Sequence, residues 1–410
     1  MRDLPRLVWV LAAGRFVNAA GSFLTVYLFL YLTGPRGLPI GPAGLLSGVL
    51  GAGLFAGNFT GGWFGDRFGH RRVLLLSSAV VGAATLAIPW TPTALLAVTL
   101  PLLGYAGATA GVSQGALVAL CVPAGDRRRA VAVGRAAFNA GYVIGPPLGA
   151  LFVADHFSWL FVADGVVTLA VRAVTARMLP GEPTRTASHP APAVGLWASL
   201  LADRALLVLL PAIVLVDTVY RQLYSTLPVY LRDHGQPVAL YAALIAVGSA
   251  MILVLEIPAT MAMRRLPALP IIASGYCLVG LGMGLFGLGT GTAIVVAAMV
   301  LLTIGEILYK TTATAHVLDR APDLLVGRYQ GLYTGAATSG TVLAAPLGAL
   351  LYSAAPGALW ATCAVAAIGA GAIVLASARI RGAQATAPPP AAPTGAAPPG
   401  RGPEPPAGAG

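Results

Sequence analysis

Long apolar stretches separated by short polar segments follow one another along most of the chain. Twelve of them approach or exceed the roughly 20 residues that a helix needs to cross the hydrocarbon core of a bilayer. They lie at residues 8–31, 43–65, 73–90, 94–121, 130–153, 158–179, 205–231, 238–263, 268–288, 291–317, 329–353 and 357–379. This pattern predicts an all-α membrane protein with twelve transmembrane helices.

Two polar segments divide the chain. Residues 180–203 form the longest polar interruption between two apolar stretches, and we expect them to be a cytoplasmic central loop. This loop would separate an N-terminal six-helix bundle, residues 1–179, from a C-terminal six-helix bundle, residues 204–380. Residues 381–410 consist almost entirely of Ala, Pro and Gly. Such a composition cannot build a packed core, so it predicts a disordered tail.

The composition excludes a water-soluble globular protein. Of the 410 residues, 57% are hydrophobic and only 10% are charged, whereas soluble domains have about 25% charged residues. The net charge of +11 results from 25 basic and 14 acidic residues. The basic residues are scattered along the chain, whereas a nucleic-acid-binding surface needs them clustered. With the N-terminus in the cytoplasm, eighteen of these 25 fall in cytoplasmic segments and two in outer loops. This bias predicts a multi-pass protein of the cell membrane with both termini in the cytoplasm.

Cysteine and histidine residues are too scattered for a disulfide framework or a metal site. Cys121, Cys277 and Cys363 lie far apart in apolar stretches, and the five histidines are equally dispersed. We therefore expect no metal and no cofactor. An enzyme would need a nucleophile with a base, or a metal cluster, and the sequence offers neither. A membrane-embedded enzyme or receptor is the least favoured class.

The two halves of the chain repeat each other weakly. A shift of 199 residues pairs Arg129 with Arg328 and Gly141 with Gly340. The same shift pairs the Pro-Leu-Gly-Ala-Leu run at residues 147–151 with that at residues 346–350. The fifth and eleventh spans therefore correspond and run in the same direction. This arrangement predicts two six-helix bundles related by an axis along the membrane normal.

A glycine-rich, charged loop joins the second and third spans. It reads Gly62-Trp63-Phe64-Gly65-Asp66-Arg67-Phe68-Gly69-His70-Arg71-Arg72 and resembles the signature loop of the major facilitator superfamily. Six residues match that signature, namely Gly62, Asp66, Arg67, Gly69, Arg71 and Arg72. The resemblance implies the major facilitator fold, with its pseudo-two-fold axis along the membrane normal, and transport by alternating access. It also implies a conformational latch, in which Asp66 would bind a helix N-terminus or Arg129.

Glycines and prolines in the fifth span form a second motif. Gly141, Gly145, Pro146 and Gly149 match the G-x-x-x-G-P-x-x-G-G element of the antiporter branches of the same superfamily, with Ala150 replacing the last glycine. We expect the small residues to let this helix pack closely against a neighbour. The resemblance implies efflux. In the fourth span, Gly111 stands where the proton-antiporter pattern R-x-x-Q-G has arginine, while the glutamine is present as Gln114.

Nine ionisable residues lie inside the predicted spans, where each costs roughly 2.5–3.5 kcal/mol at a helix centre. They are Arg15, Arg135, Asp164, Arg172, Asp217, Arg221, Glu256, Glu306 and Lys310. We expect most of them to face an interior cavity or one another. Asp217 with Arg221, and Glu306 with Lys310, have the four-residue spacing that lets an acid and a base pair on one helix face. Arg135 is expected near the cytoplasmic end of its span, and Asp164 in the scaffold away from the cavity.

These positions supply the candidate sites. A desolvated carboxylate can hold and release a proton, so Glu306, Asp217 and Glu256 are the expected proton-coupling residues. The expected substrate-binding residues are polar, basic or aromatic side chains on the same helix faces, namely Arg15, Asn18, Arg221, Tyr224, Lys310, Asn139 and Gln114. Lys310 is the only lysine in the chain, and Glu306 beside it is the strongest candidate.

Together these features favour a monomeric secondary transporter that resembles the drug:proton antiporter branch of the superfamily. It would export a small amphipathic or drug-like molecule in exchange for protons, within the lipid bilayer. An alternative keeps the fold and changes the substrate to a metabolite, such as a sugar, an amino acid or an organic anion. In that case Arg15, Arg135, Arg221 and Lys310 would clamp a carboxylate or phosphate of the substrate.

Overall fold

All regular structure in the described part of the chain is helical. The computed structural model describes residues 4–122, 127–153, 156–179, 204–263, 265–320 and 326–386. Within these residues, 12 segments are long and apolar enough to cross a membrane. They agree with the twelve predicted spans to within a few residues at each end, which confirms the predicted fold class.

Each half of the chain supplies six of these segments. The first half contains α1 (Arg6–Ala20), α2 (Phe23–Thr33), α3 (Ile40–Phe68), α4 (His70–Ala87), the short η1 (Ile88–Trp90), α5 (Thr93–Leu120), α6 (Arg127–Val153) and α7 (Phe157–Met178). The second half contains α9 (Arg204–Tyr220), the short η3 (Arg221–Leu223), α10 (Thr226–Asp233), α11 (Val238–Met263), α12 (Ala268–Phe286), α13 (Thr292–Asp319), α14 (Val326–Ala354) and α15 (Pro356–Thr386).

The first span of each half is interrupted, which the hydrophobic pattern does not predict. Gly21 and Ser22 separate α1 from α2. In the second half, α9 ends at Tyr220, the 3-10 helix η3 follows, and α10 begins at Thr226. An interruption frees backbone groups inside the membrane, and these groups need partners within the protein. The two breaks therefore mark places where polar side chains are required.

The last helix is longer than predicted. α15 continues to Thr386, so the expectation of a disordered tail from residue 381 is wrong for residues 381–386. Alanine, arginine and glutamine dominate this stretch and favour a helix, and the first proline of the tail comes only at Pro388. Residues 387–410 and the predicted central loop, residues 180–203, lie outside the described part of the chain.

Glycines allow the helices to approach one another closely. Gly275 of α12 and Gly305 of α13 face each other, and a Cβ atom on Gly275 would lie 2.8 Å from the carbonyl oxygen of Gly305. A Cβ atom on Gly305 would in turn lie 2.6 Å from the carbonyl oxygen of Gly275. Apolar burial gives little driving force between helices in lipid, so such close backbone packing holds them together.

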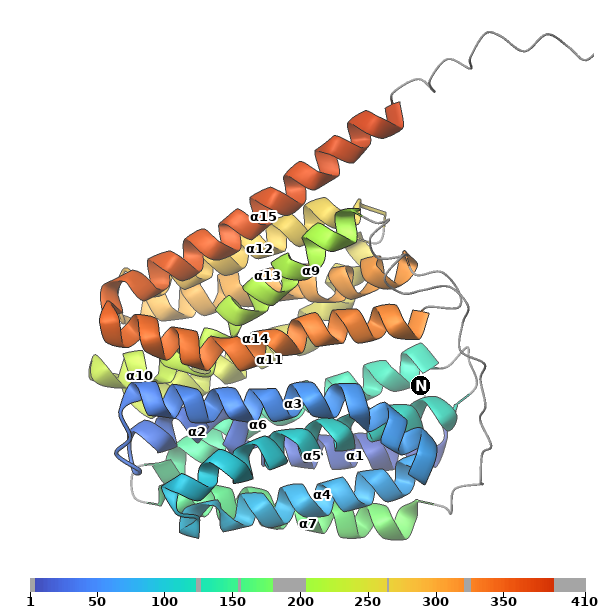
Figure 1. Cartoon of the computed structure of the whole chain (residues 1–410), viewed down its shortest axis with the longest axis vertical. Coiled ribbons are helices and arrows are strands. Elements are labelled where there is room, and N and C mark those ends of the chain that lie inside the picture. Colours follow the sequence, from blue (N-terminus) through green and yellow to red (C-terminus); the bar gives the residue numbers. More distant parts are fainter. Residues whose placement is uncertain are drawn as a thin grey trace, which may run out of the picture.

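The two halves lie side by side (Figure 1), with α3 packed against α14 and α6 against α11. Further contacts close the end of the helices opposite the N-terminus. There, Arg232 donates a hydrogen bond to the Thr33 hydroxyl over 3.1 Å, and the Tyr241 hydroxyl donates to the carbonyl oxygen of Val26 over 3.3 Å. Both bonds join one half of the chain to the other.

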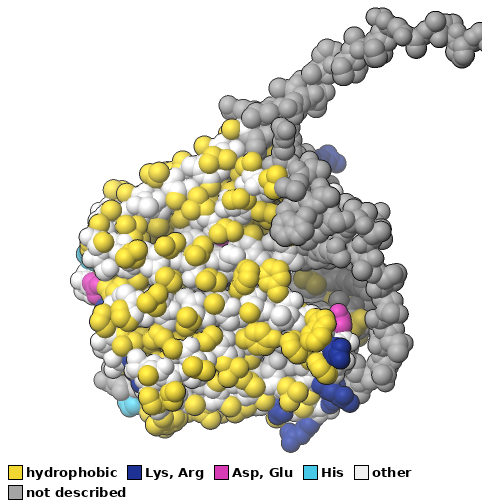
Figure 2. Space-filling model, in the orientation of Figure 1, with side chains coloured by type: hydrophobic (Ala, Val, Ile, Leu, Met, Phe, Trp, Pro, Cys, Tyr) yellow, Lys and Arg dark blue, Asp and Glu magenta, His cyan; other side chains and the backbone are white. Residues whose placement is uncertain are grey.

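Hydrophobic side chains cover the face of the molecule shown in Figure 2. Large apolar residues are exposed on the helices, among them Trp63, Leu151 and Val365. Lysine and arginine side chains gather at one end of the helices in the same view. An apolar surface of this kind suits contact with lipid, and the chain is a multi-pass membrane protein.

Candidate functional site

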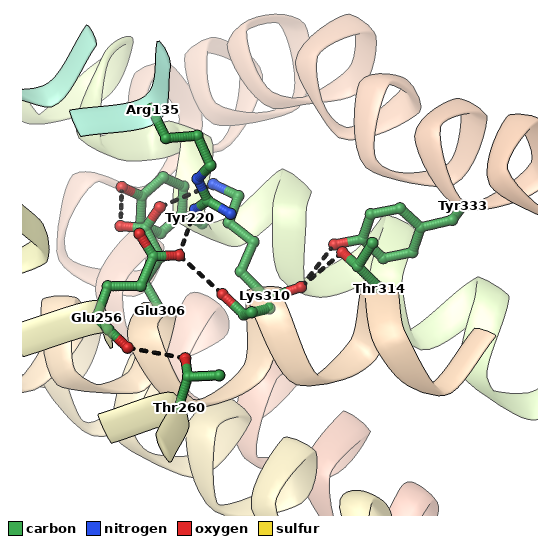
Figure 3. A network of polar contacts seen from close by, with 9 residues as sticks. Arg135, Tyr220, Glu256, Thr260, Glu306, Lys310, Thr314 and Tyr333 are labelled. Atoms are coloured by element: carbon green, nitrogen blue, oxygen red, sulfur yellow. Dashed lines mark hydrogen bonds and ion pairs between the residues drawn. The ribbon is translucent and has the colours of Figure 1, made fainter. Parts of the chain in front are cut away.

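A buried ion pair on α13 forms the centre of the candidate site (Figure 3). Nζ of Lys310 donates a hydrogen bond to Oε1 of Glu306 over 2.8 Å. The other carboxylate oxygen, Oε2, accepts a hydrogen bond of 2.6 Å from the Tyr220 hydroxyl of α9. Nζ of Lys310 also lies 4.9 Å from the centre of the Tyr220 ring, within the range of a cation–π interaction. The pair expected from the sequence is present, and both oxygens of its carboxylate are held.

A second ion pair joins the two halves of the chain. The Arg135 guanidinium of α6 contacts Oε1 of Glu256 on α11, and the Thr311 hydroxyl of α13 donates to the same oxygen over 2.8 Å. The sequence places Arg135 near the end of its span, and the residue lies close to the start of the segment Ala130–Val153. The sequence does not predict its partner, Glu256. α6 begins at Arg127, about two turns earlier, and its packing against α11 brings the guanidinium to Glu256.

The basic partner of each pair is more exposed than its acid. The side chain of Arg135 is 45% exposed and that of Lys310 is 35% exposed, whereas those of Glu256 and Glu306 are only 16% and 10% exposed. Each carboxylate is therefore shielded by a base and a hydroxyl. Protonation of either acid would release its base, so a change of charge is linked to a movement of a side chain.

The α13 backbone at Lys310 is tied to the neighbouring helix. The carbonyl oxygen of Lys310 accepts hydrogen bonds from the Thr314 hydroxyl at 2.8 Å and from the Tyr333 hydroxyl of α14 at 3.1 Å (Figure 3). The sequence gives no signal for Tyr333 or for Thr311, since neither lies on the polar stripe of its own span. Their hydrogen bonds to residues of neighbouring helices show that they belong to the site.

Asp217 lies apart from the base that the sequence pairs with it. Its Oδ1 accepts a hydrogen bond of 3.3 Å from the Tyr309 hydroxyl, and its Oδ2 is buried without a hydrogen-bond partner among the described residues. The structure holds no ion pair between Asp217 and Arg221, both of which it describes, so that expectation is wrong. The reason is that α9 ends at Tyr220, and the four-residue geometry of a continuous helix is lost at η3.

The acids of this site each have separate partners. Asp217 and Glu306 interact electrostatically, yet they bind different tyrosines. In the described part of the chain, no group of three or more His, Cys, Asp or Glu residues is placed to hold a metal ion. The contacts offer ion pairing, hydrogen bonding and proton exchange.

The expected substrate-binding residues of the first half lie around α1 and α6. The Arg15 guanidinium lies over the Phe138 ring, with Cζ 5.5 Å from the ring centre. Oδ1 of Asn18, one turn further along α1, is buried without a hydrogen-bond partner among the described residues. Asn139 follows Phe138 on α6 and is half-buried, as is Tyr224 beyond η3.

Gln114 has a packing contact instead of a free amide group. Its Nε2 donates a hydrogen bond of 3.2 Å to the carbonyl oxygen of Leu11. This bond fastens α5 to α1. Of the seven residues expected to bind substrate, Gln114 is the one whose donor group is already occupied by the backbone.

The predicted latch loop forms the turn between α3 and α4. Gly69 has φ of 92°, which glycine adopts without strain. Asp66 contacts Nε2 of His70, the first residue of α4, at 3.3 Å, and Arg71 donates a hydrogen bond to the carbonyl oxygen of Ala176 at 2.8 Å. The Arg67 guanidinium lies over the Trp63 ring. Gly62 and Arg72 lie within α3 and α4, and the side chain of Arg129 lies outside the described residues.

The glycine motif of the fifth span packs α6 against the interrupted first span. A Cβ atom on Gly141 would lie 2.6 Å from Cβ of Ala19, and one on Gly149 would lie 2.7 Å from Cε2 of Tyr27. Gly145 lies against the backbone of α1 at Ala20. The Tyr27 hydroxyl donates to the carbonyl oxygen of Pro146. The expected close packing is found, and its partner is the first span.

Asp164 has a role that the sequence does not reveal. This buried carboxylate of α7 accepts a hydrogen bond of 3.1 Å from the backbone N–H of Leu24 in the first turn of α2. It satisfies a donor that the break in the first span leaves free. The sequence does not predict this role because it does not predict the break between α1 and α2.

Comparison with known proteins gives one family. A sequence model described as Major Facilitator Superfamily matches residues 11–340. The uncharacterised MFS-type transporter YttB of Bacillus subtilis (strain 168) is 25% identical over 361 residues, which cover 85% of this chain and 89% of YttB. The uncharacterised MFS-type transporter YqjV of the same organism is 23% identical over 340 residues, covering 80% of this chain and 82% of YqjV.

Solved structures share the fold at low sequence identity. The nucleoside transporter NupG superimposes with a TM-score of 0.80 at 12% identity, covering 90% of this chain and 99% of NupG. A POT family transporter in complex with 5-aminolevulinic acid gives a TM-score of 0.79 at 16% identity, covering 92% of this chain and 96% of the other. These similarities concern the architecture alone.

Proposed function

Because the chain belongs to the major facilitator superfamily, we propose that it exports a small amphipathic molecule by alternating access, driven by protons that bind at Glu306. Transport, rather than enzymatic catalysis, is what the relatives and the structural neighbours share. Export is the proposed direction because the glycine motif of the fifth span resembles that of antiporters. We place the protein in the cell membrane as a monomer with both termini in the cytoplasm.

The arrangement around Glu306 carries the proposal. Its carboxylate is almost fully enclosed and is held by Lys310 at one oxygen and by Tyr220 at the other. A carboxylate in such a place is costly to leave charged without its base. Protonation would free Lys310, and deprotonation would recapture it. Tyr220 lies directly before the break in the seventh span, so the proton state of Glu306 is linked to a helix that can bend.

Asp217 and Glu256 extend this proposal. Asp217 lies within electrostatic reach of Lys310 and could receive the base when Glu306 is protonated. Glu256 holds Arg135 across the two halves, so its protonation would weaken a contact that alternating access has to break. We assign Glu306 the coupling proton and Glu256 the link between the halves.

The first prediction tests Glu306 directly. The purified chain is reconstituted in proteoliposomes with an acidic interior, and uptake of two probes is followed, the lipophilic cation ethidium and the aromatic anion p-aminohippurate. We expect gradient-driven uptake of at least one probe, and we expect Glu306→Gln to reduce it by at least about tenfold, because a neutral amide cannot exchange a proton.

Asp319→Asn is the matched control, since Asp319 is an exposed carboxylate at the end of the same helix. It should leave uptake unchanged. Both variants should insert into the membrane as the wild type does and should show the same elution profile during purification. Gradient-driven uptake that persists at the wild-type level in Glu306→Gln would refute the proton-coupling role, whichever probe is carried.

A further inference from the structure

The ionisable residues in and around the candidate site include more bases than acids. The bases are Arg15, Arg135, Arg221 and Lys310, and the acids are Asp217, Glu256 and Glu306; ion pairs or electrostatic interactions link them. Two of the bases are neutralised by ion pairs, Arg135 with Glu256 and Lys310 with Glu306. Arg15 and Arg221 have no ion pair with any residue that the structure describes.

Among the described residues, the close partner of Arg15 is an aromatic ring. Its guanidinium lies over Phe138 and beside the backbone of α6 at Gly134. The positive charge of Arg135 lies within its electrostatic reach. An unpaired arginine at this depth is expensive for the protein unless another group supplies the negative charge.

Arg221 is in a similar position in the second half. Its Nε is buried and has no hydrogen-bond partner in the described part of the chain. The Asp217 carboxylate lies within its electrostatic reach without forming an ion pair. Lys310 is close enough to repel it, and Tyr142 of α6 is also within its electrostatic reach. The guanidinium therefore lies near α6, the same helix that Arg15 contacts from the other half.

Aromatic rings lie beside both arginines. The ring of Phe138, over which the Arg15 guanidinium lies, packs tilted against the ring of Tyr142 with centres 4.7 Å apart. In the second half, Tyr220 and Tyr224 flank Arg221 in sequence, with ring centres 6.4 Å apart. Two guanidinium groups without an ion pair among the described residues, with aromatic rings beside them, are the groups that an aromatic or amphipathic anion requires.

We infer that the exported molecule is an amphipathic organic anion, whose acidic group binds between Arg15 and Arg221 and whose apolar body packs on Phe138 and Tyr142. Guanidinium groups bind carboxylate, sulfonate or phosphate with two parallel hydrogen bonds, and such charge-assisted bonds are the strong ones. The inference rests on the proposed function, which it deepens by naming the class of substrate.

A lipophilic cation fits this site poorly. All three carboxylates are engaged or buried. Glu306 binds Lys310 and Tyr220, and Glu256 binds Arg135 and Thr311. Asp217 is buried and accepts a hydrogen bond from Tyr309. A cation would have to displace a base from one of them. It would also approach two unpaired arginines.

Binding to the purified full-length chain in detergent, measured by calorimetry without any pH gradient, tests the inference. The probes are p-aminohippurate, p-toluenesulfonate and phenyl phosphate, with p-aminohippurate methyl ester as the neutral match and ethidium as the cation. We expect at least one anion to bind, and the ester to bind at least about tenfold more weakly than its acid. No binding by any of the three anions, or equal binding of acid and ester, overturns the inference.

Variants of the two arginines separate recognition from packing. Arg15→Gln and Arg221→Gln should each weaken binding of the acid by about tenfold or more, while the weak binding of the ester stays the same. Arg15→Lys should fall between, because it keeps the charge and loses the two parallel bonds. The control is Arg177→Gln, an exposed arginine at the end of α7. If the glutamine variants weaken acid and ester alike, the arginines serve only the fold, and the inference fails.

The inference and the proposed function can fail separately. Gradient-driven uptake of ethidium together with no anion binding would leave proton coupling standing and remove the anion site. Anion binding that depends on Arg15 and Arg221, together with transport that ignores both the gradient and Glu306→Gln, would leave the anion site and remove the coupling role.

Discussion

The two interrupted spans pack against their neighbours at equivalent positions, 199 residues apart. In the first half, Gly141 and Gly149 of α6 bring that helix against α1 and α2. In the second half, Gly340 and Gly348 of α14 do the same for α9 and α10, and a Cβ atom on Gly340 would lie 2.7 Å from Cβ of Asp217. The repeat expected from the sequence therefore has a structural counterpart. Equivalent glycines make equivalent contacts.

The polar groups at the two breaks differ. In the first half a carboxylate from a third helix, Asp164, accepts the free N–H of Leu24. In the second half Gln222 of η3 supplies the polar group. Its Nε2 donates to the carbonyl oxygen of Thr218 over 3.3 Å and to that of Ala344 on α14 over 2.8 Å. Oε1 of Gln222 accepts from the Thr226 hydroxyl over 2.7 Å. The shared part of the repeat is packing, and the chemistry is specific to each half.

This asymmetry explains where the charges lie. Gln222 provides a neutral amide at the second break, so the acids of that half, Asp217, Glu256 and Glu306, are not needed there. In the first half the buried acid Asp164 binds at the break itself. Arg15 has no ion pair with an acid of its own half among the described residues.

The largest effect is expected from filling the equivalent glycines. A Cβ atom on Gly348 would collide with Oε1 of Gln222 and lie 2.9 Å from Cγ2 of Thr226, whereas one on Gly149 would meet only the rings of Tyr27 and Phe23. Overpacking of this kind costs about 1–3 kcal/mol and occasionally more. We expect the loss of stability in Gly348→Val to exceed that in Gly149→Val, because it also displaces the hydrogen-bonded amide of Gln222, which adds about 1–3 kcal/mol.

Unfolding of the purified variants by denaturing detergent measures this difference. Gly331→Val is the control on α14, since a Cβ atom there would meet nothing within 4 Å. It should have a small effect, set by helix propensity alone. Equal losses for Gly149→Val and Gly348→Val would contradict the view that the two breaks differ in chemistry.

A smaller effect is expected from removing the polar groups of the breaks. Gln222→Leu leaves the hydroxyls of Thr226 and Ser225 without their acceptor, and Asp164→Leu leaves the N–H of Leu24 without one. Each should lower the free energy of unfolding by about 1–3 kcal/mol, the cost of unsatisfied buried groups.

Asp164→Asn separates the hydrogen bond from the charge. It keeps an acceptor oxygen for Leu24 and should recover most of the loss seen in Asp164→Leu, as measured by the same unfolding experiment. If the asparagine variant is as unstable as the leucine variant, the carboxylate charge rather than the bond to α2 holds the break, and the comparison with the neutral Gln222 has to be revised.

The sequence predicts the scaffold well because the spans and the repeat are visible in the order of residue types along the chain. The length of the apolar stretches is enough to predict the twelve spans. The glycines at residues 141 and 340 indicate the repeat from the sequence alone. The breaks escaped prediction because Gly21 and Ser22 are tolerated within a transmembrane helix as readily as at its interruption. Arg221 and Gln222 likewise do not indicate that the seventh span is interrupted.

The site was predicted in part. The pair of Glu306 and Lys310 follows from spacing on one helix, so periodicity is enough to find it. The pair of Arg135 and Glu256 joins helices from different halves, and no spacing within one span can reveal it. The false pair of Asp217 and Arg221 has the same origin as the missed breaks, since it assumes that the helix continues through residue 221.

The smallest effect is expected from two hydroxyls at equivalent positions, Tyr27 and Thr226, which are 199 residues apart. The Tyr27 hydroxyl donates to the carbonyl oxygen of Pro146, and the Thr226 hydroxyl donates to Oε1 of Gln222. Tyr27→Phe and Thr226→Val should each cost about 0.6 kcal/mol, the average for such bonds in a membrane protein. Double variants with Gln222→Leu distinguish the two hydroxyls. The losses of stability should not add for Thr226→Val, because Thr226 shares its hydrogen bond with Gln222. They should add for Tyr27→Phe, which has a different acceptor. Non-additivity for Tyr27→Phe would mean that the two breaks are coupled through α6 and α14 rather than independent.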